Sequence, residues 1–456
     1  MSEPSSANSD ASGRPARGAP ITLSPLPPLR AFLVGVHDLE TDSEEARELI
    51  EELGELARTL GMEVTGQLLV RLREPHPRYL VGSGKADEIC ALARNADAEV
   101  IIFDDSLSPA QQRNWEKLAG SLPVIDREEV ILDIFAKRAH TREAILQVGL
   151  ARAQYDLPRL KRRWIHLSRQ RGARGGMGGR GEGEQQIEID ARLVKHQIVK
   201  LRQELAAVSR HRAVQRCRRQ RRALPLAAIV GYTNAGKSCL LNRLTRAEVL
   251  VENKLFATLD PTVRRLRLGG NQELLLADTV GFIRKLPHQL VEAFKSTLEE
   301  VAGADFLLEI LDITSAEVDA HHDTTTAVLR EIGAERRPVI TVFNKIDQVT
   351  DPLLLQRFRR RFRDAVFISA RTGTGLEVLE ERLAAQVAQG LRRVSLLLPH
   401  LRGDLLAQLH RAGRVLEEKF TEAGAEVVAE APLSLLPALE PYQHQPPPAA
   451  EPEDGE

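Results

Sequence analysis

The chain has 456 residues, enough for about three domains of roughly 150 residues each. Apolar residues make up 43% and charged residues 28%, which is ordinary for a soluble globular protein. No apolar run approaches the ~18 residues that a membrane-spanning helix needs. Aromatic residues amount to only 4%, so we expect cores built from Leu, Val, Ile and Ala.

Three cysteines, Cys90, Cys217 and Cys239, are far apart in the chain, with no CxxC pair. This spacing argues against a disulfide framework or a zinc knuckle and is typical of a reducing cytoplasm. Residues 1–29 are polar and rich in Pro, Ser and Gly, without the apolar stretch of a signal peptide. We therefore expect a cytoplasmic protein whose first residues form a disordered tail.

The formal net charge of −1 conceals a strong asymmetry. Residues 159–222 contain 19 Lys and Arg but only five Asp and Glu, so the rest of the chain is acidic. A cationic block on an acidic protein is the electrostatic pattern of a polyanion-binding protein, and the simplest polyanion is nucleic acid. The alternative is a solvated, purely structural surface, because most runs of charge are of that kind.

Residues 30–140 alternate strand and helix patterns, which predicts a small α/β domain. Residues 43–60 place apolar side chains at helical spacing. Ser108 and Gly120 have the positions of an N-cap and a helix stop around a further helix. Strands are expected at 30–38, 66–72 and 99–105.

Residues 141–222 differ from this pattern, because charged, helix-forming segments flank a glycine-rich stretch. Seven glycines and three charged side chains lie between residues 172 and 183. We expect two long helices joined by a flexible glycine loop, which is a helical hairpin bearing the cationic block.

A second α/β pattern covers residues 223–390 and predicts a mostly parallel sheet with helices on both faces. Its strand candidates are 224–230, 262–268, 273–279, 305–312, 338–343 and 365–370. Residues 391–441 predict a small α/β domain made of a strand, a helix and a strand. Residues 442–456 predict a second disordered tail.

Residues 231–238, GYTNAGKS, match the P-loop pattern GxxxxGK[ST] between an apolar strand and a helix start. The backbone N–H groups of such a loop surround phosphates, and the helix N-terminus adds partial positive charge. Lys237 would contact the β- and γ-phosphates, and Ser238 would ligate Mg²⁺. The similar stretch VGSGKAD at 81–87 has Tyr79 in place of the first glycine and predicts only a structural turn.

Residues 344–347, NKID, follow the strand candidate 338–343 and predict guanine selectivity. The Asp347 carboxylate can accept hydrogen bonds from guanine N1–H and the exocyclic amine, whereas adenine would leave this charge unpaired. Asn344 and Lys345 would brace the loop and cover the base. The SAR triplet at 369–371 would supply backbone donors to the guanine carbonyl.

DTVG, at 278–281, completes the nucleotide motifs. Asp278 would hold Mg²⁺ through water, and the Gly281 N–H would contact the γ-phosphate. Thr258 is the candidate for a second Mg²⁺ ligand, with Thr262 as the alternative. Lys237 and Gly281 are the expected catalytic residues. The predicted GTP-binding residues are Gly231, Tyr232, Thr233, Asn234, Ala235, Gly236, Lys237, Ser238, Phe256, Ala257, Thr258, Leu259, Asp260, Asp278, Thr279, Val280, Gly281, Asn344, Lys345, Ile346, Asp347, Ser369, Ala370 and Arg371.

Over nearly its whole length the sequence resembles the HflX family, within the Obg–HflX group of GTPases. The specific signatures are GYTNAGKS, NKLFATLDPTVR, LADTVGFIRKLPHQLVEAFKSTLEEV and the glycine-rich GGMGGRGEGEQQIEIDARL. In the last of these, Gly179, Glu182 and Gln185 stand where the family has Leu, Pro and Thr.

The resemblance implies GTP hydrolysis without the glutamine that orients the attacking water in Ras-like enzymes, because Phe282 occupies that position. We therefore expect weak basal activity that a macromolecular partner stimulates. Phe282 could also simply pack beneath the switch segment. Asn234 could ligate K⁺ as an additional charge, or it could only cap the P-loop.

The resemblance further implies that the polyanion is ribosomal RNA of the 50S subunit and the 70S ribosome, with the glycine loop near the peptidyl-transferase centre. The implied role is to split or rescue stalled ribosomes in the GTP state, as a ribosome-associated monomer. The alternatives are a ribosome-assembly factor or a regulatory adaptor that recruits proteins without touching RNA. An ATP-assisted RNA-remodelling activity is disfavoured because VGSGKAD lacks a phosphate-binding loop, and an RNA-modifying activity because we find no Cys or His cluster for it.

Overall fold

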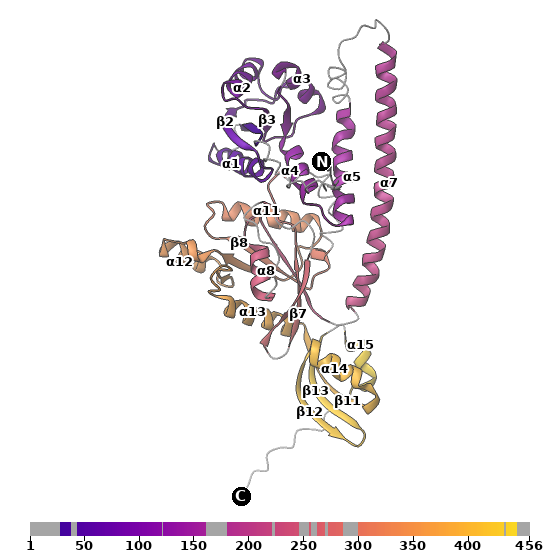
Figure 1. Cartoon of the computed structure of the whole chain (residues 1–456). Helices are drawn as coiled ribbons and strands as arrows, with labels where there is room; N and C mark the ends of the chain where they lie inside the picture. The colour runs from indigo at the N-terminus through magenta and orange to yellow at the C-terminus, as the bar shows by residue number, and fades with distance from the viewer. Residues whose placement is uncertain are drawn as a thin grey trace, which may run out of the picture.

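The computed structural model describes residues 28–37, 43–120, 122–160, 180–220, 224–245, 255–256, 262–269, 272–285, 300–432 and 435–444. They form an N-terminal unit, a pair of long helices, a central unit and a C-terminal unit (Figure 1). The predicted α/β fold with a mostly parallel central sheet is confirmed. Both expected tails fall largely outside the described residues. None of the described helices is both long enough and apolar enough to cross a bilayer.

The N-terminal unit is a four-stranded parallel sheet in the order β2-β1-β3-β4. Chain order therefore reverses between β1 and β3, and the carboxyl ends of strands at such a point form a crevice. VGSGKAD begins helix α2, where Lys85 pairs with Glu88 at 2.8 Å. Ser108 and Gln111 form a capping box at α3, as the N-cap pattern predicts. The elements are β1 Arg30–His37, α1 Ser43–Thr59, β2 Glu63–Arg71, α2 Ser83–Asn95, β3 Val100–Phe103, α3 Pro109–Ala119, β4 Val124–Asp126 and α4 Arg127–Arg138.

Two long helices follow, α5 (Arg142–Asp156), extended by the 3₁₀ turn Leu157–Arg159, and α7 (Arg180–Gln220). They pack side by side through apolar side chains that include Leu150 and Ile198 (Figure 1). Because α7 already begins at Arg180, the last four residues of the expected glycine loop are helical. Once a helix is formed each further residue adds a hydrogen bond, which offsets the ~1 kcal/mol penalty of a glycine.

The central unit is a six-stranded sheet in the order β10-β9-β8-β5-β7-β6, in which only the β6–β7 pair is antiparallel. β10 is shorter than expected because Ile368 and the residues after it turn into a loop, where the Gly373 N–H bonds to Ser369 O. The elements are β5 Leu226–Gly231, α8 Lys237–Thr245, β6 Thr262–Arg267, β7 Glu273–Asp278, β8 Phe306–Asp312, α11 Val318–Glu331, β9 Val339–Asn344, η3 Ile346–Gln348, α12 Pro352–Arg361, β10 Val366–Phe367 and α13 Leu376–Gln389.

The C-terminal unit has three antiparallel strands in the order β11-β13-β12, so the expectation of two strands was wrong. Gly424 (φ +146°) begins β13 and packs closely on β11, since a Cβ there would lie 2.2 Å from Leu398 O. The expected tail also begins later, because Gln443 bridges to Leu396 on the sheet. The elements are β11 Leu391–Leu398, η4 His400–Arg402, α14 Gly403–Ala412, β12 Arg414–Thr421, β13 Gly424–Pro432, α15 Leu436–Leu439 and η5 Glu440–Tyr442.

Candidate nucleotide site

The P-loop joins β5 to α8, and two of its glycines are required by close packing. A Cβ on Gly231 (φ +138°) would lie 2.3 Å from Ile310 O, in the neighbouring strand β8. A Cβ on Gly236 (φ +94°) would lie 2.3 Å from Asn344 Nδ2. The Thr233 hydroxyl is buried and finds no hydrogen-bond partner within the described part of the chain. An orphaned polar atom here is consistent with a ligand-binding loop.

Lys237 is buried at the start of α8. Its Nζ donates to the backbone carbonyls of Gly231 (3.1 Å) and Tyr232 (2.6 Å). Burial lowers the pKa of Lys237 to about 8, and the Asp278 carboxylate only partly opposes this shift. A phosphate group would be a far stronger counter-charge for this ammonium than two carbonyl oxygens.

Ser238 and Asp278 bring two oxygen donors to one point. Ser238 Oγ donates a 2.7 Å hydrogen bond to Asp278 Oδ2, and the Asp278 side chain is fully buried. Hydroxyl and carboxylate oxygens are the hard donors that Mg²⁺ prefers, so these residues fit that ion. Thr262 lies opposite Asp278 in the β6–β7 pairing. Thr258 lies outside the described residues, together with Ala257, Leu259 and Asp260.

The DTVG segment lies directly against the P-loop. A Cβ on Gly281 would lie 2.9 Å from the Thr233 Cα, so a side chain at this position would force the P-loop backbone to shift. The Phe282 N–H donates to Gly231 O (3.1 Å), and Phe282 O accepts from the Thr233 N–H (2.8 Å). The Phe282 side chain is buried in a cluster with Val230, Leu307 and other apolar residues. The Phe282 side chain therefore packs in the core, in agreement with the expectation that it could serve as a packing residue.

The predicted base-binding motifs meet around Asn344. Its Nδ2 donates to Ala235 O of the P-loop (2.8 Å), and its Oδ1 accepts from the Ala370 N–H (2.9 Å). The exposed carboxylate of Asp347 accepts from Ser369 Oγ at 2.7 Å. One carboxamide thus holds the P-loop and the SAR loop together, while the Ala370 N–H that we expected to face guanine bonds to Asn344.

Several other predicted residues have structural contacts of their own. Lys345 has a left-handed backbone (φ +66°), and its Nζ lies 2.6 Å from Asp312 Oδ2. The Thr279 hydroxyl donates to Ile229 O at 2.6 Å. The Phe256 ring packs edge-on against Phe135 of the N-terminal unit, and Val280 belongs to the same cluster. Ile346 packs beside Phe343, and Arg371 is exposed.

Three family models match the chain in order. Residues 47–136 match the "GTP-binding GTPase N-terminal" model, 138–219 the "GTP-binding GTPase Middle Region" model, and 226–345 the "50S ribosome-binding GTPase" model. The GTPase HflX of Akkermansia muciniphila is 46% identical over 425 residues, covering 91% of this chain and 96% of its own. The GTPase HflX of Escherichia coli is 42% identical over 395 residues, covering 86% and 91%.

The chain belongs to the HflX family of GTPases. Accordingly it is a GTP-binding P-loop protein that hydrolyses GTP, as the motifs predict, and such GTPases use Mg²⁺ with the nucleotide. A crystal structure of a GTP-binding protein from Sulfolobus solfataricus in complex with GDP is 25% identical, with a TM-score of 0.41, and covers 79% of this chain and 99% of that one.

This HflX-family GTPase has a cavity of about 290 Å³ beside the P-loop, which the sequence motifs did not predict. It lies between helix α1 and the central unit, and Thr233 and Asn234 form part of its wall. Burial raises the pKa of Glu55 in this wall, with a further contribution from Glu52. The glutamates recur every three or four residues along one face of α1, the sequence signal that could have revealed them. The acidic lining residues are Glu48, Glu51, Glu52, Glu55, Asp312 and Glu317.

Tyr232 connects the P-loop of the HflX-family GTPase with its N-terminal unit. The hydroxyl donates to Glu52 Oε1 (2.7 Å) and accepts from the Arg284 N–H (2.9 Å). The ring stacks on His321 with centroids 3.7 Å apart. Burial, with Arg284 nearby, lowers the pKa of His321 to about 4, so its imidazole is neutral at pH 7.

Lys285, which comes shortly after DTVG, lies at the carboxyl end of β3 in the N-terminal sheet. Lys285 Nζ lies 2.7 Å from carboxylate oxygens of both Asp104 and Asp105, just after β3. Arg284 pairs with Glu317 at 2.7 Å and with Glu52 at 3.4 Å. The expected γ-phosphate-sensing segment is therefore held by carboxylates from both units.

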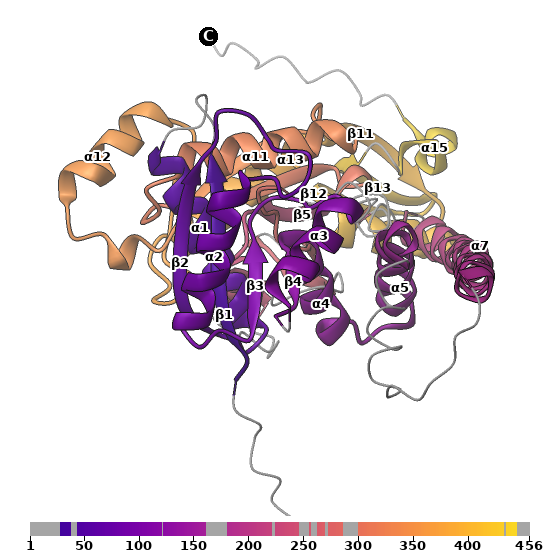
Figure 2. The same ribbon diagram turned by 90° about the horizontal axis from the view of Figure 1, so that it is seen from above.

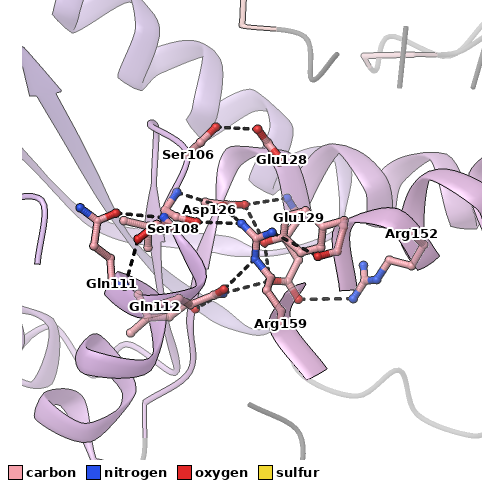
Figure 3. Close-up of polar contacts among 12 residues, drawn as sticks. Ser106, Ser108, Gln111, Gln112, Asp126, Glu128, Glu129, Arg152 and Arg159 are labelled. Carbon is pink, nitrogen blue, oxygen red and sulfur yellow. Dashed lines mark hydrogen bonds and ion pairs between the residues drawn. The ribbon is translucent and has the colours of Figure 1, made fainter. Parts of the chain in front are cut away.

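A buried polar network joins the N-terminal unit to α5 (Figure 3). Asp126 accepts hydrogen bonds from the Leu107 N–H (3.1 Å) and the Tyr155 hydroxyl (2.9 Å). The Arg159 guanidinium lies 3.3 Å from Asp126 and stacks 3.6 Å above the Tyr155 ring. In Figure 3, Arg159 and Arg152 point toward Asp126 and Glu129. The first helix of the hairpin is thus firmly attached to the N-terminal unit.

Proposed function

We propose that this HflX-family GTPase binds ribosomal RNA of the 50S subunit or the 70S ribosome through the hairpin of α5 and α7. GTP-dependent rearrangement would then split or rescue stalled ribosomes. Two features support the proposal. Residues 226–345 match a model described as a 50S ribosome-binding GTPase, and residues 159–222 are strongly cationic.

The observation that most supports this proposal is a series of contacts from the P-loop to the base of the hairpin. Tyr232 bonds to Glu52, and Glu52 pairs with the buried Arg127 at 3.0 Å. Arg127 follows Asp126, which bonds to the α5 residue Tyr155. A change at the nucleotide can therefore act on the hairpin through packed, mostly buried groups.

We assign the nucleotide roles as follows. Lys237 neutralises the phosphates, and the Gly281 N–H contacts the γ-phosphate. Ser238 and Asp278, with Thr258, would hold Mg²⁺, which offsets charge on the β- and γ-phosphates when bound. Asp347 selects guanine, and Asn344 keeps the base loops in place.

Hydrolysis by this site would be slow without a partner. The core position of Phe282 leaves no side chain there to orient water. A group supplied in trans can accelerate related enzymes by up to ~10⁵-fold, so we propose stimulation by ribosomes. Asn234 (φ +61°), an exposed residue in the middle of the P-loop, would ligate K⁺. Comparing turnover in KCl and NaCl tests this role, and equal rates would remove it.

The decisive experiment is sedimentation of 70S ribosomes with this protein and GTP, a nonhydrolysable analogue or GDP. We expect separated subunits with GTP or its analogue and intact 70S with GDP. Lys237→Ala is the matched control and should leave the profile unchanged. An unaltered profile with every nucleotide would contradict the splitting role.

The same preparations distinguish an RNA-binding factor from a protein adaptor. Binding through phosphate contacts weakens steeply with salt, whereas binding to a protein partner need not. Persistent 50S binding without subunit separation would instead favour a ribosome-assembly factor. We also propose a monomer, with domain boundaries near residues 140, 222 and 390, which light scattering and limited proteolysis of the full chain can test.

A further inference from the structure

Helix α12 bears a dense cluster of arginines that neither the nucleotide site nor the hairpin uses. The segment RFRRRFR at 357–363 interleaves two phenylalanines with five arginines. Phe358 and Phe362 pack against Phe343, with ring centroids 5.1 and 5.0 Å apart. The aromatic side chains therefore anchor the helix to strand β9. Five exposed arginines, four on α12 and Arg363 just beyond its end, are named hereafter the α12 arginines: Arg357, Arg359, Arg360, Arg361 and Arg363.

The protein itself neutralises little of this charge. Arg361 pairs with Asp319 at 2.8 Å, and Arg359 lies over the Phe367 ring at 5.4 Å. Within the described residues, Arg357, Arg360 and Arg363 have no carboxylate partner. Like charges three or four residues apart destabilise a helix. A row of unpaired guanidinium groups thus opposes folding slightly, and an external anion would relieve the repulsion.

The chemistry of this surface fits phosphodiester groups. Guanidinium groups bind phosphate oxygens in a bidentate manner and are more weakly hydrated than lysine ammonium groups. Side chains three residues apart on a helix, such as Arg357 and Arg360, have Cβ atoms about 5–6 Å apart. A nucleic-acid backbone presents a regular row of negative charges to such a surface.

The position of α12 separates it from the other cationic surface. In both views α12 projects on the opposite side of the molecule from α7 (Figures 1 and 2). The helix also begins shortly after Asn344 and packs on the preceding Phe343. The α12 arginines are therefore a distinct surface, close in the fold to the nucleotide motifs.

We propose that the α12 arginines form a second RNA-binding surface, which contacts the phosphate backbone of an RNA helix independently of the hairpin. In so far as that RNA is ribosomal, the inference rests on the proposed function. Two surfaces on opposite sides of the molecule require either a large RNA partner or two separate RNA segments. One such contact would hold the nucleotide-binding unit, and the other would hold the hairpin.

The test compares the full-length triple variant R357Q/R360Q/R363Q with a control that removes the same charge. R330Q/R382Q/R393Q changes three exposed arginines on other elements. Binding of a short RNA duplex is measured across KCl concentrations. The slope of log K against log [KCl] should become shallower by about 2–3 in the α12 variant, since each lost phosphate contact removes ~0.9. The control should change it by less than about 1.

GTP affinity and circular dichroism should be unchanged in both variants, which shows that α12 remains folded. An α12 variant with the wild-type slope would overturn the inference. The inference would also be overturned if the α12 variant kept its RNA binding and lost only binding to anionic lipid vesicles or to a poly-glutamate peptide. If the wild-type protein and the α12 variant bind 50S subunits equally in sedimentation, this inference is overturned while the proposed function stands. A wild-type protein that binds neither ribosomes nor RNA would overturn the proposed function as well.

Discussion

The Tyr232 hydroxyl donates a 2.7 Å hydrogen bond to Glu52 Oε1 on helix α1, and this bond joins residues 180 positions apart in the chain. Tyr232 also lies inside the P-loop motif, between Gly231 and Thr233. One side chain is thus part of both the phosphate-binding loop and the contact between two units. Replacing it tests whether the two are coupled.

Tyr232→Phe should weaken the contact between α1 and the P-loop without disrupting the fold. The ring can still stack on His321, while the hydrogen bonds to Glu52 and from the Arg284 N–H are lost. We expect destabilisation of about 1–2 kcal/mol, from one bond to a charged group and one unsatisfied donor. Faster hydrogen exchange in α1 should accompany it.

Tyr442→Phe is the matched control, because it removes a 2.8 Å hydrogen bond from Arg402 in the C-terminal unit. It should leave exchange in α1 unchanged. If Tyr232→Phe also leaves α1 exchange unchanged, the hydroxyl does not hold the two units together.

The sequence predicted the elements of the central sheet well because its strands are buried apolar runs, such as 226–231 and 306–312. Burial on both faces of a parallel sheet produces this continuous pattern. The C-terminal hairpin was missed because β12 is mostly exposed and charged, so 414–421 lacks a strand pattern. Its formation depends on pairing with β13, which local sequence does not encode.

Within the site, the P-loop, DTVG, NKID and SAR segments were recognisable because each needs particular residue types. The contacts of Arg284 and Lys285 with the N-terminal unit were not recognisable. They depend on how two folded units pack, and a lone basic pair resembles ordinary surface charge. Likewise, the sequence could not show whether Phe282 merely replaces the water-orienting glutamine or also packs in the core, since this depends on its burial.

Nucleotide binding should take up protons at mildly alkaline pH. Without nucleotide, Lys237 has a pKa of about 8, and bound phosphates would favour its charged form. About half a proton should therefore be absorbed per nucleotide at pH 8, and almost none at pH 6.5. Titration calorimetry in two buffers of different ionisation enthalpy measures this number.

Lys285→Gln serves as the control for that experiment. Asp104 and Asp105 raise the pKa of Lys285 against the effect of burial, so this lysine stays charged throughout the range. Its replacement should leave proton uptake unaltered. Proton uptake that is the same at pH 6.5 and pH 8 would show that Lys237 is not the group responsible.

Asp347→Asn should change the base preference of the site. The substitution replaces the exposed carboxylate, which accepts charged hydrogen bonds from guanine, by a neutral amide. GTP binding should therefore weaken by about 1.5–3 kcal/mol, or roughly 10- to 150-fold. The new amide can donate to the 2-carbonyl of xanthine, so affinity for XTP should rise. Ser369→Ala removes the 2.7 Å bond that orients Asp347 and the 3.0 Å bond that Ser369 Oγ accepts from the Thr372 N–H, and it should weaken GTP binding a few-fold without any gain for XTP. Equal GTP affinity in Asp347→Asn and wild type would exclude Asp347 from base recognition.

Acid should loosen the Tyr232–His321 stack. The folded-state pKa of His321 is about 4, against 6.5 for an unperturbed histidine, so the unfolded chain binds the extra proton first. Stability contributed by the neutral imidazole is complete above pH 6.5 and declines as pH falls toward 4.

His322 has the opposite shift, because its 2.8 Å contact with Glu309 raises the pKa. Its contribution is complete below pH 6.5 and is lost as pH rises through the raised value.

His321→Phe keeps an aromatic ring for stacking and removes the titrating group. Thermal unfolding midpoints between pH 4.5 and 7.5 should therefore fall less with acid in His321→Phe than in wild type. His322→Asn should show the reverse: its unfolding midpoint should fall below that of wild type mainly at the acid end of this range. A wild-type acid response in His321→Phe would mean that another group, and not the imidazole against the P-loop tyrosine, makes this contact sensitive to pH.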